Sequence, residues 1–185
     1  MSKHLLLAIP LVALMACGGG SSEEGTKLPE PKTAEFKKLN FGDKTILTNG
    51  AIIGMSIDDV RKLHKSETPD SDDEGYLTYR YPLGPEEYDH EYVLEYAYDS
   101  ETKKLWKVHF DITVPDNKTG VELYNDIKAN LEARYGAAKK VTDDPDWEEY
   151  TWKADIGGVK TDISIQRMID SEAGYLLLYF EEPWE

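Results

Sequence analysis

Alternation of apolar and polar residues occupies much of the chain after residue 75 and predicts extended strands. Because successive side chains of a strand point to opposite faces, the apolar members of each run are expected to share one buried face. Six runs have this pattern, and their expected inward-facing residues are Leu77, Tyr79 and Tyr81; Tyr92, Leu94, Tyr96 and Tyr98; Trp106, Val108, Phe110 and Ile112; Tyr150, Trp152 and Ala154; Val159, Thr161, Ile163 and Ile165; and Leu176, Leu178 and Phe180.

Two other segments have the 3.6-residue period of an amphipathic helix. The first begins at the capping-box pattern Ser56-Ile57-Asp58-Asp59 and continues to about Lys65. The second begins at the similar pattern Thr119-Gly120-Val121-Glu122, and Gly136 is placed to end it in a left-handed turn. The expected apolar stripes are Ile57, Val60, Leu63 and His64 in the first helix, and Leu123, Tyr124, Ile127, Leu131 and Tyr135 in the second.

The predicted order, one helix followed by three strands, occurs twice. Acidic pairs precede the first strand of each set, at Asp72-Asp73 and Asp143-Asp144, and Asp-Ser-Glu turns at 99–101 and 170–172 precede the third. We therefore predict a two-layer α+β domain over residues 34–185, with two helices packed on one face of an antiparallel sheet. The repeated order predicts a tandem αβββ duplication, with halves at about 50–114 and 119–182.

The N-terminus has the pattern of an export signal. A cationic start is followed by the apolar run Leu5–Met15, which is shorter than the roughly 20 residues that a membrane-spanning helix needs. The next residues, Leu14-Met15-Ala16-Cys17, resemble the lipobox of bacterial lipoproteins. This resemblance implies that a signal peptide, residues 1–16, is removed and that Cys17 carries the lipid. The alternative is an ordinary secretory signal with an incidental cysteine.

Residues 17–33 are rich in Gly, Ser and Pro without apolar periodicity, which predicts a flexible tether. The lipoprotein resemblance implies a lipid-anchored protein of the cell envelope, and Gly18 rather than Asp after the cysteine fits outer-membrane sorting. Ser21-Ser22-Glu23-Glu24 is either a plain linker or a surface-export signal, so the periplasmic or surface side stays open.

The formal net charge of −15 at pH 7 limits the classes of partner that the chain can bind. Nucleic acid is excluded as a partner because affinity for it depends on Lys and Arg neutralising phosphates. Anionic head groups would also repel the chain, so attachment to a membrane is expected through lipid rather than through a basic patch. Cys17 is the only cysteine, which leaves no disulfide and no thiolate metal site in the domain.

Two short patterns in the domain resemble those of SmpA/OmlA and β-lactamase-inhibitor-like envelope domains. They are Gly54-Met55-Ser56 leading into Asp59-Val60, and Tyr135-Gly136 at a helix end. The resemblance implies a two-layer fold with helices on one face of an antiparallel sheet.

Candidate metal or catalytic chemistry is sparse. Asp70–Gly75 matches the front of a calcium loop, with oxygens from Asp70, Asp72 and Glu74, but the twelfth position is Tyr81 rather than Glu. The alternative is a solvated acidic loop. The charged run Glu86–Glu91 lacks the spacing of a zinc site and is expected to form a hairpin loop. The chain has no Gly-x-Ser-x-Gly elbow and no phosphate-binding loop, so neither a cofactor nor catalysis is expected.

The polar side of the predicted sheet is the remaining candidate site. It is expected to display Thr78, Arg80, Glu95, Lys107, His109, Asp111, Thr151, Lys153, Asp162, Ser164 and Gln166, with Tyr175, Leu177 and Tyr179 from the last strand. Because Tyr provides large contact area at low entropic cost, we predict a binding surface that includes Arg80, Lys107, His109, Tyr175 and Tyr179. The alternatives are an ordinary solvated face, or a face covered by residues Phe36–Phe41 or by a second copy.

The sequence therefore predicts a lipid-anchored envelope protein that acts as a non-catalytic binding or assembly module, with an envelope protein or a glycan as its partner. Two alternatives remain. One is an envelope hydrolase that uses carboxylates on the open sheet face, and the other is a calcium-responsive module that uses Asp70, Asp72 and Glu74.

Overall fold

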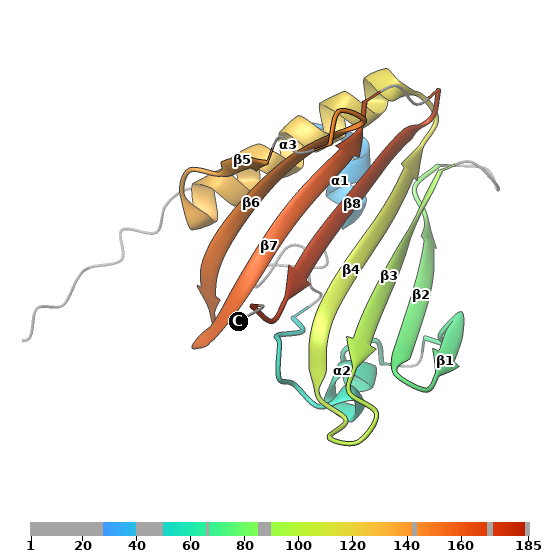
Figure 1. Ribbon diagram of the computed structural model, residues 1–185. Coiled ribbons are helices and arrows are strands. Elements are labelled where there is room, and N and C mark those ends of the chain that lie inside the picture. The colour runs from blue at the N-terminus through green and yellow to red at the C-terminus, as the bar shows by residue number, and fades with distance from the viewer. Residues whose placement is uncertain are drawn as a thin grey trace, which may run out of the picture.

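The protein is built around one antiparallel sheet of eight strands, seen in a computed structural model of the chain (Figure 1). The structure describes residues 28–39, 50–65, 67–84, 90–141, 144–169 and 172–183. Cys17, the predicted signal peptide, Phe41, Asp143, Asp170 and Ser171 lie outside these ranges, as does most of the Glu86–Glu91 run.

The strands form two meanders that meet in the middle of the sheet. Their bounds are β1 Ser71–Asp73, β2 Tyr76–Pro82, β3 Glu91–Tyr98, β4 Leu105–Val114, β5 Lys139–Val141, β6 Trp147–Ile156, β7 Val159–Met168 and β8 Gly174–Glu181. The order across the sheet is β1-β2-β3-β4-β8-β7-β6-β5. The last strand of each meander is therefore central, and the two shortest strands are the edges. The predicted α+β class and antiparallel pairing are confirmed.

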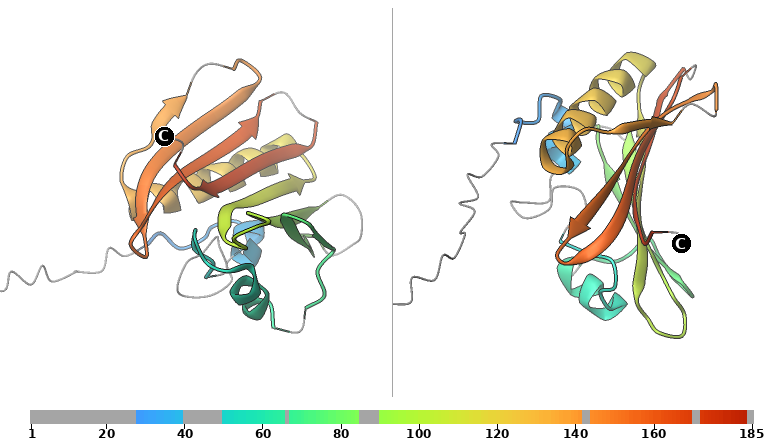
Figure 2. Two further views of the ribbon diagram at one scale, coloured as in Figure 1. Left: turned by 60° about the horizontal axis from the view of Figure 1, so that its bottom comes forward. Right: turned by 60° about the vertical axis from the view of Figure 1, so that its left-hand side comes forward.

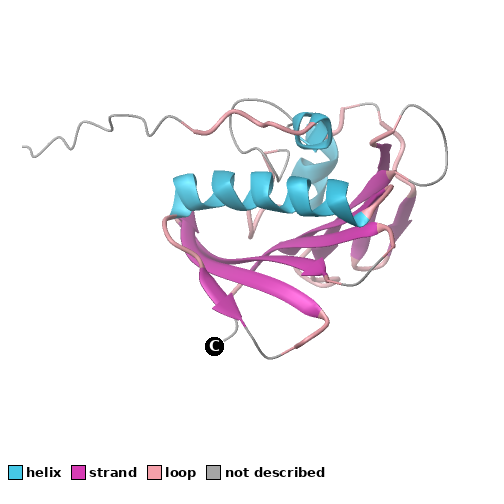
Figure 3. Cartoon of the chain, turned by 90° about the horizontal axis from the view of Figure 1, so that it is seen from above, coloured by secondary structure: helices cyan, strands magenta, loops and turns pink. Residues whose placement is uncertain are grey.

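Three helices in the described part of the chain accompany the sheet: α1 Ala34–Leu39, α2 Ile57–Leu63 and α3 Asn117–Tyr135. The long helix α3 runs across one face and contacts β8, β7, β4 and β6 (Figures 2 and 3). The short helix α1 packs against α3. The helix α2 is tied to the β3–β4 end of the sheet, because the amide of Ile57 donates to the carbonyl of Lys103 at 2.9 Å.

The buried core follows the predicted alternation with one shift. On β8, Leu176, Leu178 and Phe180 are buried, while the residues between them are partly exposed. The prediction for Trp106 is wrong. Leu105, not Trp106, faces the core, because the register slips by one residue where Tyr98 pairs with Leu105 and Ala97 with Lys107. Such a bulge places one extra residue on β4 and reverses the alternation locally.

The start of α3 also differs from the prediction. The N-cap is Asp116 rather than Thr119, and its side chain accepts from the amide of Thr119 at 2.9 Å. An aspartate three residues upstream satisfies the free amides first and extends the helix by nearly one turn. The first helix begins as predicted, with the amide of Asp59 donating to Oγ of Ser56 at 3.2 Å.

Three elements were not predicted: α1, β1 and β5. The acidic segment expected as a loop contains β1, which pairs with β2 from Ser71 to Asp73. The suggestion that residues 36–41 cover the polar sheet face does not hold for the described part of this segment. Phe36 and Leu39 are buried in α1, which packs against α3 instead.

Candidate functional site

The sheet face turned away from α3 is the candidate site, and we call it the open face. Its residues form rows of direct cross-strand neighbours. The central row crosses the sheet as Thr78, Glu95, His109, Tyr179, Ser164 and Thr151. The flanking rows run as Ala97, Lys107, Glu181, Asp162 and Lys153 on one side, and as Arg80, Val93, Asp111, Leu177, Gln166 and Glu149 on the other.

Tyr179 lies at the centre of the open face, where the side chains of Lys107 and His109 contact its ring. The ammonium of Lys107 lies 4.3 Å from the centroid of its ring. The ring of His109 stacks on it with centroids 4.4 Å apart and an interplanar angle of 18°. Burial, together with the nearby carboxylates of Asp111 and Glu181, raises the pKa of Tyr179 to about 12. The phenol is therefore neutral at physiological pH.

His109 is held on this face with an unused ring nitrogen. Its Nδ1 lies 3.9 Å from a carboxylate oxygen of Glu95. Its Nε2 is buried and has no hydrogen-bond partner among the described residues. An unpaired buried polar atom costs stability, so Nε2 of His109 is an unsatisfied group within this face.

Tyr175 extends the aromatic surface along β8. Its hydroxyl donates to Oδ2 of Asp111 at 2.9 Å, and its ring meets Trp147 edge to face with centroids 5.9 Å apart. Burial and the bond to Asp111 raise the pKa of Tyr175 well above its usual value. Tyr175, Leu177 and Tyr179 together form a partly exposed stripe on a central strand, which we call the β8 stripe.

Of the five residues predicted for binding, the structure brings Lys107, His109 and Tyr179 into contact. Tyr175 lies on β8, the strand of Tyr179. Arg80 is separate. It lies on β2, where its guanidinium pairs with Glu91 and approaches Asp70 at 3.6 Å. The gathered residues come from β4 and β8, which are neighbours only because the two meanders meet there.

A hollow of about 200 Å³ lies on the open face over β6, β7 and the end of β8. It forms because the central row continues from a tyrosine to the small residues Ser164 and Thr151. We call it the acidic hollow, and its polar lining is Glu149, Thr151, Lys153, Asp162, Ser164 and Glu181.

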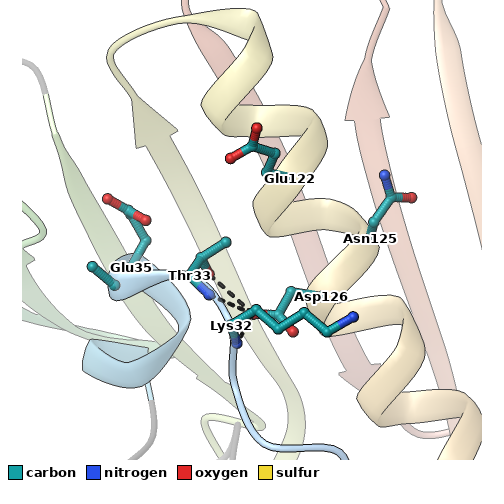
Figure 4. Close-up of a pocket in the computed structure, with 7 residues that line it drawn as sticks. Lys32, Thr33, Glu35, Glu122, Asn125 and Asp126 are labelled. Atoms are coloured by element: carbon teal, nitrogen blue, oxygen red, sulfur yellow. Dashed lines mark hydrogen bonds between the residues drawn. The ribbon is translucent and has the colours of Figure 1, made fainter.

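A second hollow, of about 480 Å³, lies on the helix side between residues 32–35 and α3 (Figure 4). Asp126 borders it and is used structurally. One of its oxygens accepts from the amides of Lys32 and Thr33, at 2.7 and 2.9 Å, and from the Thr33 hydroxyl at 3.1 Å. The hydroxyl of Thr33 in turn accepts from the amide of Phe36 at 3.2 Å, so the carboxylate fixes the start of α1.

The calcium-ligand candidates do not converge. Asp72 accepts from Arg61 of α2 at 2.7 Å, whereas Asp70 lies near Arg80. Glu74 is exposed in the turn between β1 and β2. Among the described residues, no group of three or more His, Cys, Asp or Glu side chains could hold a metal ion.

A buried polar cluster around His64 was not identified from the sequence, which placed this residue only on an apolar stripe. His64 is 2 % exposed and stacks on Tyr79 with centroids 3.7 Å apart. Its Nε2 lies 2.9 Å from the Tyr96 hydroxyl, and its Nδ1 lies 3.0 Å from that of Tyr81. Tyr81 also donates to Glu67 at 2.6 Å. Three tyrosines on the facing strands were the only signal for this cluster.

The protonation states of this cluster follow from its burial. Burial lowers the pKa of His64, so its imidazole is neutral near pH 7. The hydrogen bond from Tyr81 lowers the pKa of Glu67. The cluster thus links α2 and the loop after it to the sheet.

No protein-family model, curated protein or solved structure matches this chain.

Proposed function

We propose that this protein is a lipid-anchored binding or assembly module of the bacterial cell envelope, with the open face as its contact surface. The observation that carries the proposal is the β8 stripe, where Tyr175, Leu177 and Tyr179 stay partly exposed on a central strand. Rigid aromatic side chains surrounded by polar residues are typical of the energetic centre of an interface. An envelope protein is the expected partner.

We infer a two-layer domain that arose by duplication of a helix and a strand meander. Each half has one helix followed by four strands, α2 with β1–β4 and α3 with β5–β8. The sheet order is symmetric about the β4–β8 pair, as expected if two copies joined through their last strands. This arrangement agrees with the resemblance to SmpA/OmlA and β-lactamase-inhibitor-like domains.

The proposed anchor is Cys17, with outer-membrane sorting. No helix among the described residues is long and apolar enough to cross a membrane. The described chain begins at Leu28 beside α3, where the carbonyl of Pro29 accepts from Asn130 at 3.4 Å. A tether from Cys17 to Leu28 could reach roughly 40 Å at about 3.5 Å per residue. It would join the domain on the helix side and leave the open face free for a partner.

Photo-crosslinking in the native envelope tests the contact surface. A benzophenone amino acid replaces Leu177 on the open face or, as a control, Lys118 on α3, whose side chain is 86 % exposed. We expect a discrete adduct from position 177 that Tyr179→Ala diminishes, and no adduct from position 118. Equal labelling at both positions, or none at 177, would contradict a contact surface on the open face.

A further inference from the structure

The acidic hollow keeps negative charge that the protein itself does not neutralise. Lys153 lies 3.3 Å from both carboxylate oxygens of Asp162, so this cation is already paired. Glu149 lies on β6, the strand of Lys153, and Glu181 lies on β8, and neither side chain has an ion pair or hydrogen bond among the described residues. Carboxylates therefore outnumber cations around a concave surface, and a cationic group entering it would be attracted.

The tyrosine next to this hollow in the central row, Tyr179, already contacts a cation within the protein. The ammonium of Lys107 lies over the ring of Tyr179. The electron-rich face of a neutral phenol attracts ammonium and guanidinium groups. Tyr179 pairs across the strands with Ser164, which lines the acidic hollow, so the tyrosine is the next residue of the central row after the hollow.

The size of the hollow limits what can enter it. At about 200 Å³ it is smaller than the roughly 300–1,000 Å³ typical of sites for drug-sized ligands. One long side chain fits this description better than an oligosaccharide. The hydroxyls of Thr151 and Ser164 can accept hydrogen bonds from the donors of such a side chain.

We propose that the acidic hollow binds an arginine or lysine side chain from a basic protein partner, while apolar groups of that partner rest on the β8 stripe. This inference rests on the proposed function and names the chemistry of its partner. The chain carries a net charge of −15, so long-range attraction would also favour the approach of a basic surface.

A pair of matched peptides tests the charge requirement on the full chain. The probe is acetyl-Leu-Gly-Arg-Gly-Leu-amide, and its control has citrulline, the neutral isostere, in place of arginine. Amide chemical shifts are followed by NMR during titration. We expect shifts concentrated at Glu149, Thr151 and Ser164, at least fivefold weaker binding of the citrulline peptide, and weaker binding of the arginine peptide at high salt.

Charge-matched variants test the location. Glu149→Gln with Glu181→Gln should weaken binding of the arginine peptide about tenfold. Glu101→Gln with Glu172→Gln removes the same charge from exposed turns and should leave binding within twofold. Urea unfolding of both double variants verifies that they remain folded.

Several results would overturn the inference. They are equal affinity for the arginine and citrulline peptides, equal weakening in both double variants, or an N-acetylglucosamine oligomer shifting these amides when the arginine peptide does not. Crosslinking at position 177 separates the two proposals. If it persists while the peptide fails to bind, the inference about partner chemistry is wrong and the contact surface stands.

Discussion

An alanine at Gly120 tests how closely α3 approaches the sheet. Gly120 is buried in the first part of α3, and it faces Gly174 at the start of β8. A Cβ at position 120 would lie 2.7 Å from the Cα of Gly174, far inside the usual carbon contact distance of about 3.5–4.0 Å. The obstructing atom belongs to the backbone, so no side-chain rotation can relieve the collision.

Two opposing effects set the expected magnitude. Replacing glycine by alanine inside a helix normally stabilises a protein by about 1 kcal/mol. Forcing an extra carbon into a packed core costs about 1–3 kcal/mol, and a backbone obstruction favours the upper half of that range. We therefore expect Gly120→Ala to lower the free energy of unfolding by about 1–2 kcal/mol. In a loosely packed helix the same change would raise it by about 1 kcal/mol, so the sign is diagnostic.

Urea unfolding of the full chain, followed by circular dichroism, measures this change. With a slope of about 2 kcal/mol per molar urea, the midpoint should fall by about 0.5–1 M. Asn125→Ala, on an exposed position of the same helix, is the control and should change stability by less than about 0.5 kcal/mol. A midpoint for Gly120→Ala above that of the parent would refute the close packing of α3 against β8.

Three further predictions concern other sites. Asp126→Ala leaves the amides of Lys32 and Thr33 without their acceptor, so it should lower the free energy of unfolding by about 1–3 kcal/mol and speed tryptic cleavage after Lys32. Cleavage at the parent's rate would contradict this role of Asp126. Because the pKa of His64 is lowered in the folded protein, this histidine takes up a proton in the unfolded chain at a higher pH than in the folded one. The free energy of unfolding should therefore fall as the pH drops below about 6.5, by at most about 1.4 kcal/mol per pH unit. His64→Gln should flatten this slope in urea unfolding at pH 7 and 5.5, and an identical slope would argue against it. Cys17→Ser should release the protein from the membrane fraction, and an unmodified thiol on the native protein would remove the anchor proposal.

Local periodicity determined most of the strands and which of their faces is buried. For Leu176, Leu178 and Phe180 the alternation alone predicts the buried face correctly, because a period of two follows from the backbone geometry of a single strand. The same reasoning failed where local geometry is interrupted, as at the bulge that places Leu105 in the core in place of Trp106. The three-residue strands β1 and β5 are too short to show any period, so pairing with a neighbour is what defines them.

The composition of the open face was also readable from the sequence, whereas the grouping of its residues was not. Lys107 and His109 meet Tyr179 because β4 pairs with β8 at the junction of the two meanders, a contact between strands far apart in the chain. Arg80 has the same polar alternation but lies two strands away from β4, where Glu91 and Asp70 engage it. Alternation predicts on which face of the sheet a side chain lies. The neighbours of that side chain across the sheet depend on the order of the strands, which only long-range packing decides.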